Sequence, residues 1–80
     1  MPLPGRPLHV AAVAGALVLA LAVGERCAVA WVNYGELHAT AALDLRRRDV
    51  RRVLAGEPAA FLLVRVPLAG ERLLRVVRPS

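Results

Sequence analysis

The chain has 80 residues, of which 58% are hydrophobic, and its formal net charge is +5 at pH 7. A chain of this length forms at most one small domain and buries little core of its own, which excludes a multidomain architecture. The single cysteine, Cys27, excludes an internal disulfide framework. The excess of basic residues favours anionic partners, namely phospholipid head groups, acidic proteins or nucleic acid.

An apolar run dominates the N-terminal third of the chain. Residues 1–7 are rich in proline and glycine, which predicts an irregular lead-in. Residues 8–24 follow without a fully charged side chain. A hydrocarbon core about 30 Å thick requires roughly 17–25 helical residues, so this run is long enough to cross a membrane. The sequence therefore predicts a mainly α protein with a single transmembrane helix over residues 8–32 and the membrane core at 8–24.

The C-terminal end of this predicted span has the character of a membrane interface. An arginine there can extend its charge to the head groups, and tryptophan and tyrosine prefer the same level. The predicted interface anchors are Arg26, Trp31 and Tyr34. Arg6 and the amino group carry positive charge on the N-terminal side, whereas Glu25 offsets Arg26 on the other side. This difference favours an N-terminus on the inside of the membrane.

Small residues recur at every fourth position of the predicted span. On a helix they would form one groove that a second helix can approach closely, which is a common mode of association in membranes. The predicted helix-packing residues are Ala12, Ala16, Ala20, Gly24 and Ala28. The stripe predicts that the span pairs with other transmembrane subunits or with a second copy of itself.

The same region has a second interpretation, as a secretory signal peptide. The amino group and the first arginine form a positive leader, residues 10–23 form an apolar stretch, and Ala28-Val29-Ala30 resembles a cleavage site. Cleavage after Ala30 would release a basic peptide. Glu25 and Arg26 stand between the apolar stretch and the small residues, which favours a retained span.

A second helix is predicted after a break at residues 33–35, where asparagine and glycine surround a tyrosine. This helix covers residues 36–56 and ends at a glycine that is followed shortly by a proline. Its apolar residues share one face and its arginines gather on the other, so the predicted helix is amphipathic. The arginines predicted to bind lipid or a partner are Arg46, Arg47, Arg48, Arg51 and Arg52.

Residues 57–80 form the predicted tail. Two β-leaning runs, at 61–66 and 72–77, flank a turn that contains Pro67 and Gly70. This arrangement predicts a short hairpin. Arginines at every third position of the second run leave a short amphipathic helix or an irregular tail as the alternative.

One segment resembles the region that follows the first span of membrane-anchored ATP-dependent metalloproteases. The similar residues are Tyr34, Glu36, Leu37, Val50, Val53 and Gly56. Asp49 stands where that family has glycine, the spacing is about a helical turn too long, and 80 residues hold no ATPase or protease portion. The resemblance implies a small α+β domain on the far side of a membrane and no catalysis, and it does not identify the family.

The sequence carries no recognisable catalytic motif. It has no Gly-rich phosphate loop, no cysteine and histidine spacing typical of a metal site, and no paired carboxylates. Cys27 is expected to pack as a small hydrophobic residue, and His9 to lie at an interface. We therefore expect no enzyme activity, no metal and no cofactor.

These expectations lead to one functional hypothesis. The chain is expected to be a small single-pass membrane protein, a non-catalytic accessory, assembly or stabilising subunit of a larger membrane complex. Its expected partners are membrane lipids and other transmembrane subunits or a second copy. Nucleic acid is not expected, because the basic segment offers no aromatic residue for stacking. The alternatives are the secreted basic peptide cleaved after Ala30 and a cationic peptide that perturbs membranes by itself.

Overall fold

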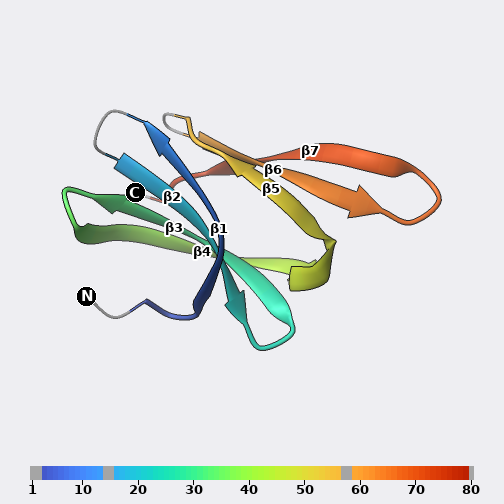
Figure 1. Ribbon diagram of the computed structural model, residues 1–80, viewed down its shortest axis with the longest axis horizontal. Coiled ribbons are helices and arrows are strands. Elements are labelled where there is room, and N and C mark those ends of the chain that lie inside the picture. Colours follow the sequence, from blue (N-terminus) through green and yellow to red (C-terminus); the bar gives the residue numbers. More distant parts are fainter. Residues whose placement is uncertain (1–2, 14–15, 57–58, 80) are drawn as a thin grey trace.

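The computed structural model describes residues 3–13, 16–56 and 59–79, which form seven strands and one short 3-10 helix. The first sheet has the order β1-β2-β3-β4 and the second the order β5-β6-β7, and all neighbouring strands are antiparallel (Figure 1). The elements are β1 (Arg6–Val13), β2 (Ala16–Val23), β3 (Arg26–Asn33), β4 (Glu36–Arg46), η1 (Arg47–Asp49), β5 (Val50–Leu54), β6 (Ala59–Val66) and β7 (Gly70–Val77).

The predicted transmembrane helix over residues 8–32 is wrong, because this segment forms β1, β2 and most of β3. Within the described part of the chain, no helix has the length and apolar character that a membrane crossing requires, and this finding overturns the predicted single-pass localisation. The physical reason lies in β2 and β3, whose side chains are buried on both faces of the sheet. A strand buried on both faces is a continuous apolar run in sequence, as a membrane helix is.

Two tight turns convert the apolar run into hairpins. Gly24 has a φ of +60° and begins the two-residue turn between Val23 and Arg26, where only glycine adopts this conformation without a steric cost. Tyr34 and Gly35, with φ of 49° and 80°, form the next two-residue turn. Positive φ at both positions is the requirement of the turn that matches the twist of a β-hairpin.

The predicted amphipathic helix over residues 36–56 is also wrong, since the segment forms β4, η1 and β5. Burial alternates at every residue along β4. The odd-numbered residues of 37–45 are half-buried, and the even-numbered residues of 36–46 are exposed. A period of two belongs to a strand. Alanine, leucine and arginine have high helix propensity, but packing of the alternate side chains overrides that preference. The α+β domain implied by the metalloprotease resemblance is likewise not the observed fold.

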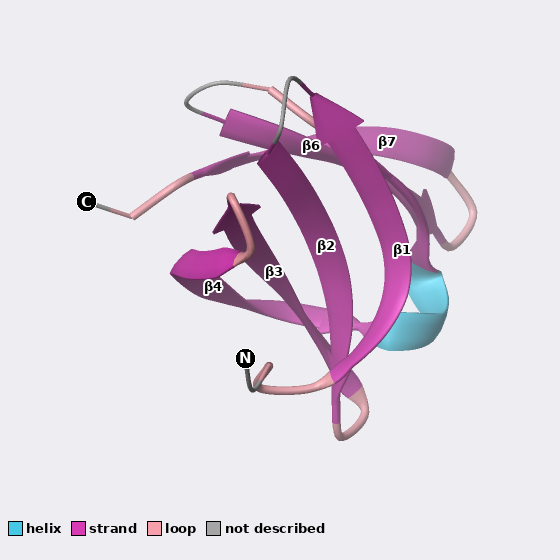
Figure 2. Cartoon of the chain, turned by 60° about the vertical axis from the view of Figure 1, so that its left-hand side comes forward, coloured by secondary structure: helices cyan, strands magenta, loops and turns pink. Residues whose placement is uncertain are grey.

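The main core lies between the inner faces of the two sheets, which Figure 2 shows crossing over one another. Val29 and Leu62 are fully buried, and they are contributed by β3 and β6. The first sheet provides Val18, Ala20, Cys27, Val29 and Trp31, and the second provides Val50, Val53, Ala60, Leu62, Val64 and Val76.

A smaller apolar cluster covers the opposite face of the first sheet. Leu21 and Ala30 are fully buried there, with Leu19 and Val32 beside them. Leu3 and Leu37 pack against this cluster from the N-terminal segment and from the start of β4. The central hairpin β2–β3 therefore has a hydrophobic covering on both of its faces.

One hydrogen bond joins the two sheets, and a second anchors the connection between them to the first sheet. The Nε2 of His9 lies 3.1 Å from the carbonyl oxygen of Val50 and donates to it, linking β1 to β5. The backbone N–H of Arg47 donates to the carbonyl oxygen of Glu25 over 3.0 Å, linking η1 to the β2–β3 turn. His9 is thus a structural link between the sheets.

We expect the substitution Leu62→Ala to reduce the free energy of unfolding by about 2–5 kcal/mol, because it leaves a cavity between the sheets. Urea denaturation followed by tryptophan fluorescence measures this loss through the single Trp31.

The matched control is Leu68→Ala, which removes the same atoms from a fully exposed turn residue. We expect it to change the free energy of unfolding by less than about 0.5 kcal/mol. Equal losses in the two variants would contradict the position of the core.

Candidate functional site

The small residues predicted to pack in one helical stripe are distributed over several strands. Ala12 lies in β1, Ala16 and Ala20 lie in β2, Gly24 lies in the β2–β3 turn, and Ala28 lies in β3. Ala20 and Ala28 are buried, but on opposite faces of the first sheet, because only Ala20 belongs to the main core. Without the helix these residues do not form a groove.

The three predicted interface anchors have three different environments. Arg26 forms an exposed ion pair with Asp44, at 3.1 Å between Nη1 and Oδ1. Trp31 is 4% exposed and lies in the main core, whereas Tyr34 is 85% exposed in the β3–β4 turn. The three side chains therefore do not lie together at one surface, as interface anchors would.

The five arginines of residues 46–52 do not share one face. Arg46 ends β4, Arg47 and Arg48 lie in η1, and Arg51 and Arg52 lie in β5. Arg51 contacts Glu71 of β7, at 3.7 Å between Nε and Oε2, and both side chains are about half exposed. The register shifts between Val50 and Arg52, so this irregularity turns the two β5 arginines away from the core.

The second sheet concentrates the positive charge. Among the described residues of β5, β6 and β7, five are arginines and only Glu71 is acidic. The arginines are Arg51, Arg52, Arg65, Arg72 and Arg75, and all of them are exposed. Sequence reasoning selected the first two and missed the other three. The signal was present in the spacing of three between Arg72 and Arg75, which places them on opposite faces of a strand.

The outer face of this sheet combines these charges with exposed apolar side chains. Leu73 is 59% exposed and Leu54 is 41% exposed. Strand register places the outward-facing residues in adjacent rows across three strands. This basic outer face consists of Arg52, Leu54, Phe61, Leu63, Arg65, Glu71, Leu73, Arg75 and Val77.

Strand β7 is the most exposed element of the fold. Seven of its eight residues are exposed, and only Val76 is buried. Arg72 and Leu74 stand opposite Val64 and Leu62, which belong to the core face, yet both are exposed. The first sheet therefore covers β7 only near Val76 and leaves residues 70–75 uncovered. Figure 1 shows the turn end of the β6–β7 hairpin extending away from the first sheet.

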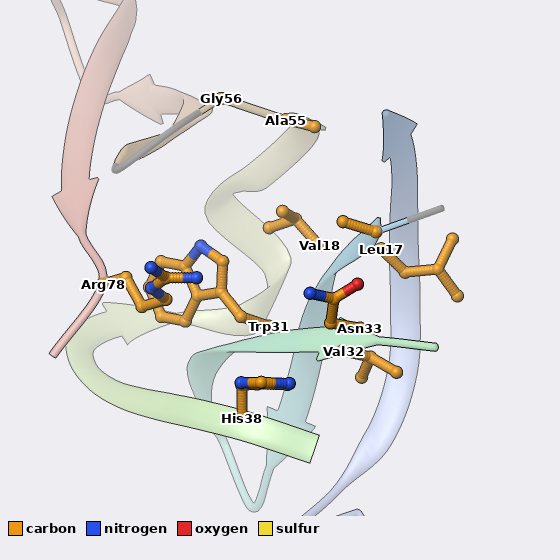
Figure 3. A pocket seen from close by; sticks show the side chains of 10 residues that line it. Leu17, Val18, Trp31, Val32, Asn33, His38, Ala55, Gly56 and Arg78 are labelled. Atoms are coloured by element: carbon orange, nitrogen blue, oxygen red, sulfur yellow. The ribbon is translucent and has the colours of Figure 1, made fainter. Parts of the chain in front are cut away.

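One pocket lies where the first sheet meets the β5–β6 connection and the end of the chain. In Figure 3 Arg78 and Trp31 stand on one side of it, with Asn33 and Val18 on the other and His38 below. The indole Nε1 of Trp31 is buried and has no hydrogen-bond acceptor among the described residues. The cavity volume is about 10 Å³, which is room for roughly one water molecule, so the pocket is not a site for a drug-sized ligand.

The described residues contain no group of three or more histidine, cysteine, aspartate or glutamate side chains placed to hold a metal ion. Comparison with protein-family models, with curated proteins and with solved structures finds no match. Within the described structure, the second sheet is where exposed basic and apolar side chains lie together.

Cys27 is a buried, free thiol whose side chain lies in the main core, 1% exposed. Burial raises the pKa of the thiol above its ordinary value of 9.0, and a backbone hydrogen bond from Leu21 lowers it to a smaller extent. The reactive form of cysteine is the thiolate, so burial suppresses its chemistry.

At pH 8 we expect Cys27 to react with a thiol reagent such as DTNB at least about 100-fold more slowly in the native protein than in urea, because the native thiol is protonated and enclosed. Cys27 is the only cysteine, so the absorbance change reports this site alone. Since the folded pKa exceeds the unfolded one, the thiol contributes stability below pH 9.0 that is lost as the pH rises further. Equal reaction rates in the two states would contradict the burial.

Proposed function

We propose that this chain is a non-catalytic interaction domain that binds an acidic region of a partner protein through its second sheet. The observation that carries the proposal is the exposure of β7, where seven of eight residues face solvent and two of them are arginines. The proposal retains the accessory role expected from the sequence and assigns the docking to a sheet in place of a membrane span.

The charge of the second sheet supports an acidic partner. Among the described residues, Arg51 is the one arginine of the second sheet that forms an ion pair, with Glu71. An exposed ion pair contributes only about 0.2–1 kcal/mol. Affinity therefore requires apolar burial as well, and Leu54, Leu73 and Val77 are at least two-fifths exposed beside these charges.

The geometry favours a protein over a lipid surface. Arg72 and Arg75 belong to opposite faces of the sheet, as do Leu73 and Leu74. A bilayer surface is planar and contacts only one of these faces at a time. A polypeptide can contact both faces of an exposed strand at once.

The geometry also favours a protein over nucleic acid. Sequence-tolerant binding of single strands relies on exposed aromatic side chains on which bases stack. The chain has one residue each of tryptophan, tyrosine and phenylalanine. Trp31 is buried and Tyr34 lies in the β3–β4 turn, which leaves only the half-buried Phe61 on the second sheet.

Charge reversal on β7 tests the proposal. We expect the double substitution Arg72→Glu and Arg75→Glu to weaken binding of a fluorescein-labelled poly-L-glutamate peptide by about tenfold or more, because two attractive contacts become repulsive. Fluorescence anisotropy at low ionic strength measures the dissociation constant.

The matched control carries Arg6→Glu and Arg46→Glu, two exposed positions on the first sheet that change the net charge by the same amount. It should lose less than about threefold, since screening limits the effect of distant charges. Equal losses in the two double variants would refute a specific site on β7. Tighter binding to phosphatidylserine vesicles or to oligo-dT than to poly-glutamate would assign the surface to lipid or nucleic acid.

A further inference from the structure

We infer that the free edge of β7 binds an extended acidic segment of the partner as an additional β-strand. The inference rests on the proposed function and specifies the mode of binding and the sequence pattern of the segment. It predicts acidic residues separated by two apolar residues, which complement the arginines and leucines of β7.

β7 lies at one edge of the second sheet. In the order β5-β6-β7 it pairs only with β6, so its other backbone edge has no neighbouring strand among the described residues. The opposite edge of the sheet, at β5, packs beside β1 and receives the His9 hydrogen bond. An exposed strand edge presents unpaired N–H and C=O groups that can pair with an incoming strand.

The order of side chains along β7 determines which strand can pair with it favourably. Arg72 and Arg75 are three residues apart and therefore point to opposite sides of the sheet, with Leu73 and Leu74 between them. In an added strand, the residue opposite each β7 residue points to the same side and lies within contact distance. The favourable partner of this edge is a segment with acidic residues at positions i and i+3 and apolar residues between them.

The other accessible edge, at β4, lacks this pattern. Its exposed residues are Glu36, His38, Thr40, Ala42, Asp44 and Arg46, which include two acidic residues and one arginine. Asp44 also pairs with Arg26. Charge complementarity thus assigns the acidic segment to β7.

A peptide series tests the inference with the full-length chain. The parent peptide is fluorescein-labelled and contains Glu-Leu-Val-Glu-Val-Leu-Glu, and a second peptide has the same residues with the three glutamates adjacent. Two further peptides carry N-methyl groups on alternate amides of the parent, at the odd or at the even positions. Anisotropy titrations give the dissociation constant of each.

Strand addition predicts a parity effect. Only every second amide of an added strand points toward β7, so methylation at one parity should weaken binding about tenfold or more and methylation at the other less than about threefold. The peptide with adjacent glutamates should also bind about tenfold more weakly, and Arg72→Glu with Arg75→Glu should abolish the preference.

The outcomes separate this inference from the proposed function. If all four peptides bind with similar affinity and the β7 charge reversal weakens them all, the acidic-partner function stands and strand addition is refuted. If the Arg72→Glu, Arg75→Glu variant and the Arg6→Glu, Arg46→Glu control lose the same affinity for the peptides, both proposals fail. A parity effect that the β7 substitutions leave unchanged would place the added strand on another edge and overturn the assignment to β7.

Discussion

The burial of the central hairpin β2–β3 on both of its faces is the constraint on which the rest of the fold depends. One face joins the main core through Val29 and Trp31, and the other forms the smaller cluster around Leu21 and Ala30. Among the described residues, 11 buried hydrophobic residues lie in the first sheet and seven lie in the second. The second sheet covers only one face of the first.

That distribution explains why β7 is left uncovered. Val76 is the one residue of β7 in the core between the sheets. Residues 70–75 of the same strand are not covered by the first sheet. An uncovered, hydrophobic edge promotes aggregation, and charged side chains are a common means of preventing it. Arg72 and Arg75 place charged side chains on this exposed strand, and the same charges favour an acidic partner strand.

The sequence indicated two of the turns but not the secondary structure between them. Gly35 and the Pro67–Gly70 segment lie at observed turns, because positive φ and a fixed proline φ are local properties of those residues. Gly24 begins another turn, although the sequence interpretation assigned it to the packing stripe of a helix. The apolar run at 8–24 was ambiguous, since its composition suits a membrane helix and a doubly buried strand equally. The arginine cluster at 46–52 was visible, whereas its separation into three elements depends on irregular pairing that no local pattern encodes. The proposed site on β7 could not be predicted from the sequence, because it depends on which strand has a neighbour on one edge only. That is a property of the tertiary structure.

The antiparallel meander also constrains how the domain folds. Within each sheet, every strand pairs with its neighbour in sequence, so each hairpin can close over a short loop. β4 and β5 follow one another in sequence but belong to different sheets. The contact between His9 and Val50 spans 41 residues and can form only when the two sheets meet. Docking of the sheets therefore closes longer loops than any single hairpin does. Because seven of the eight residues of β7 are exposed, we expect its amides to exchange with solvent before those of the buried strands β2 and β3.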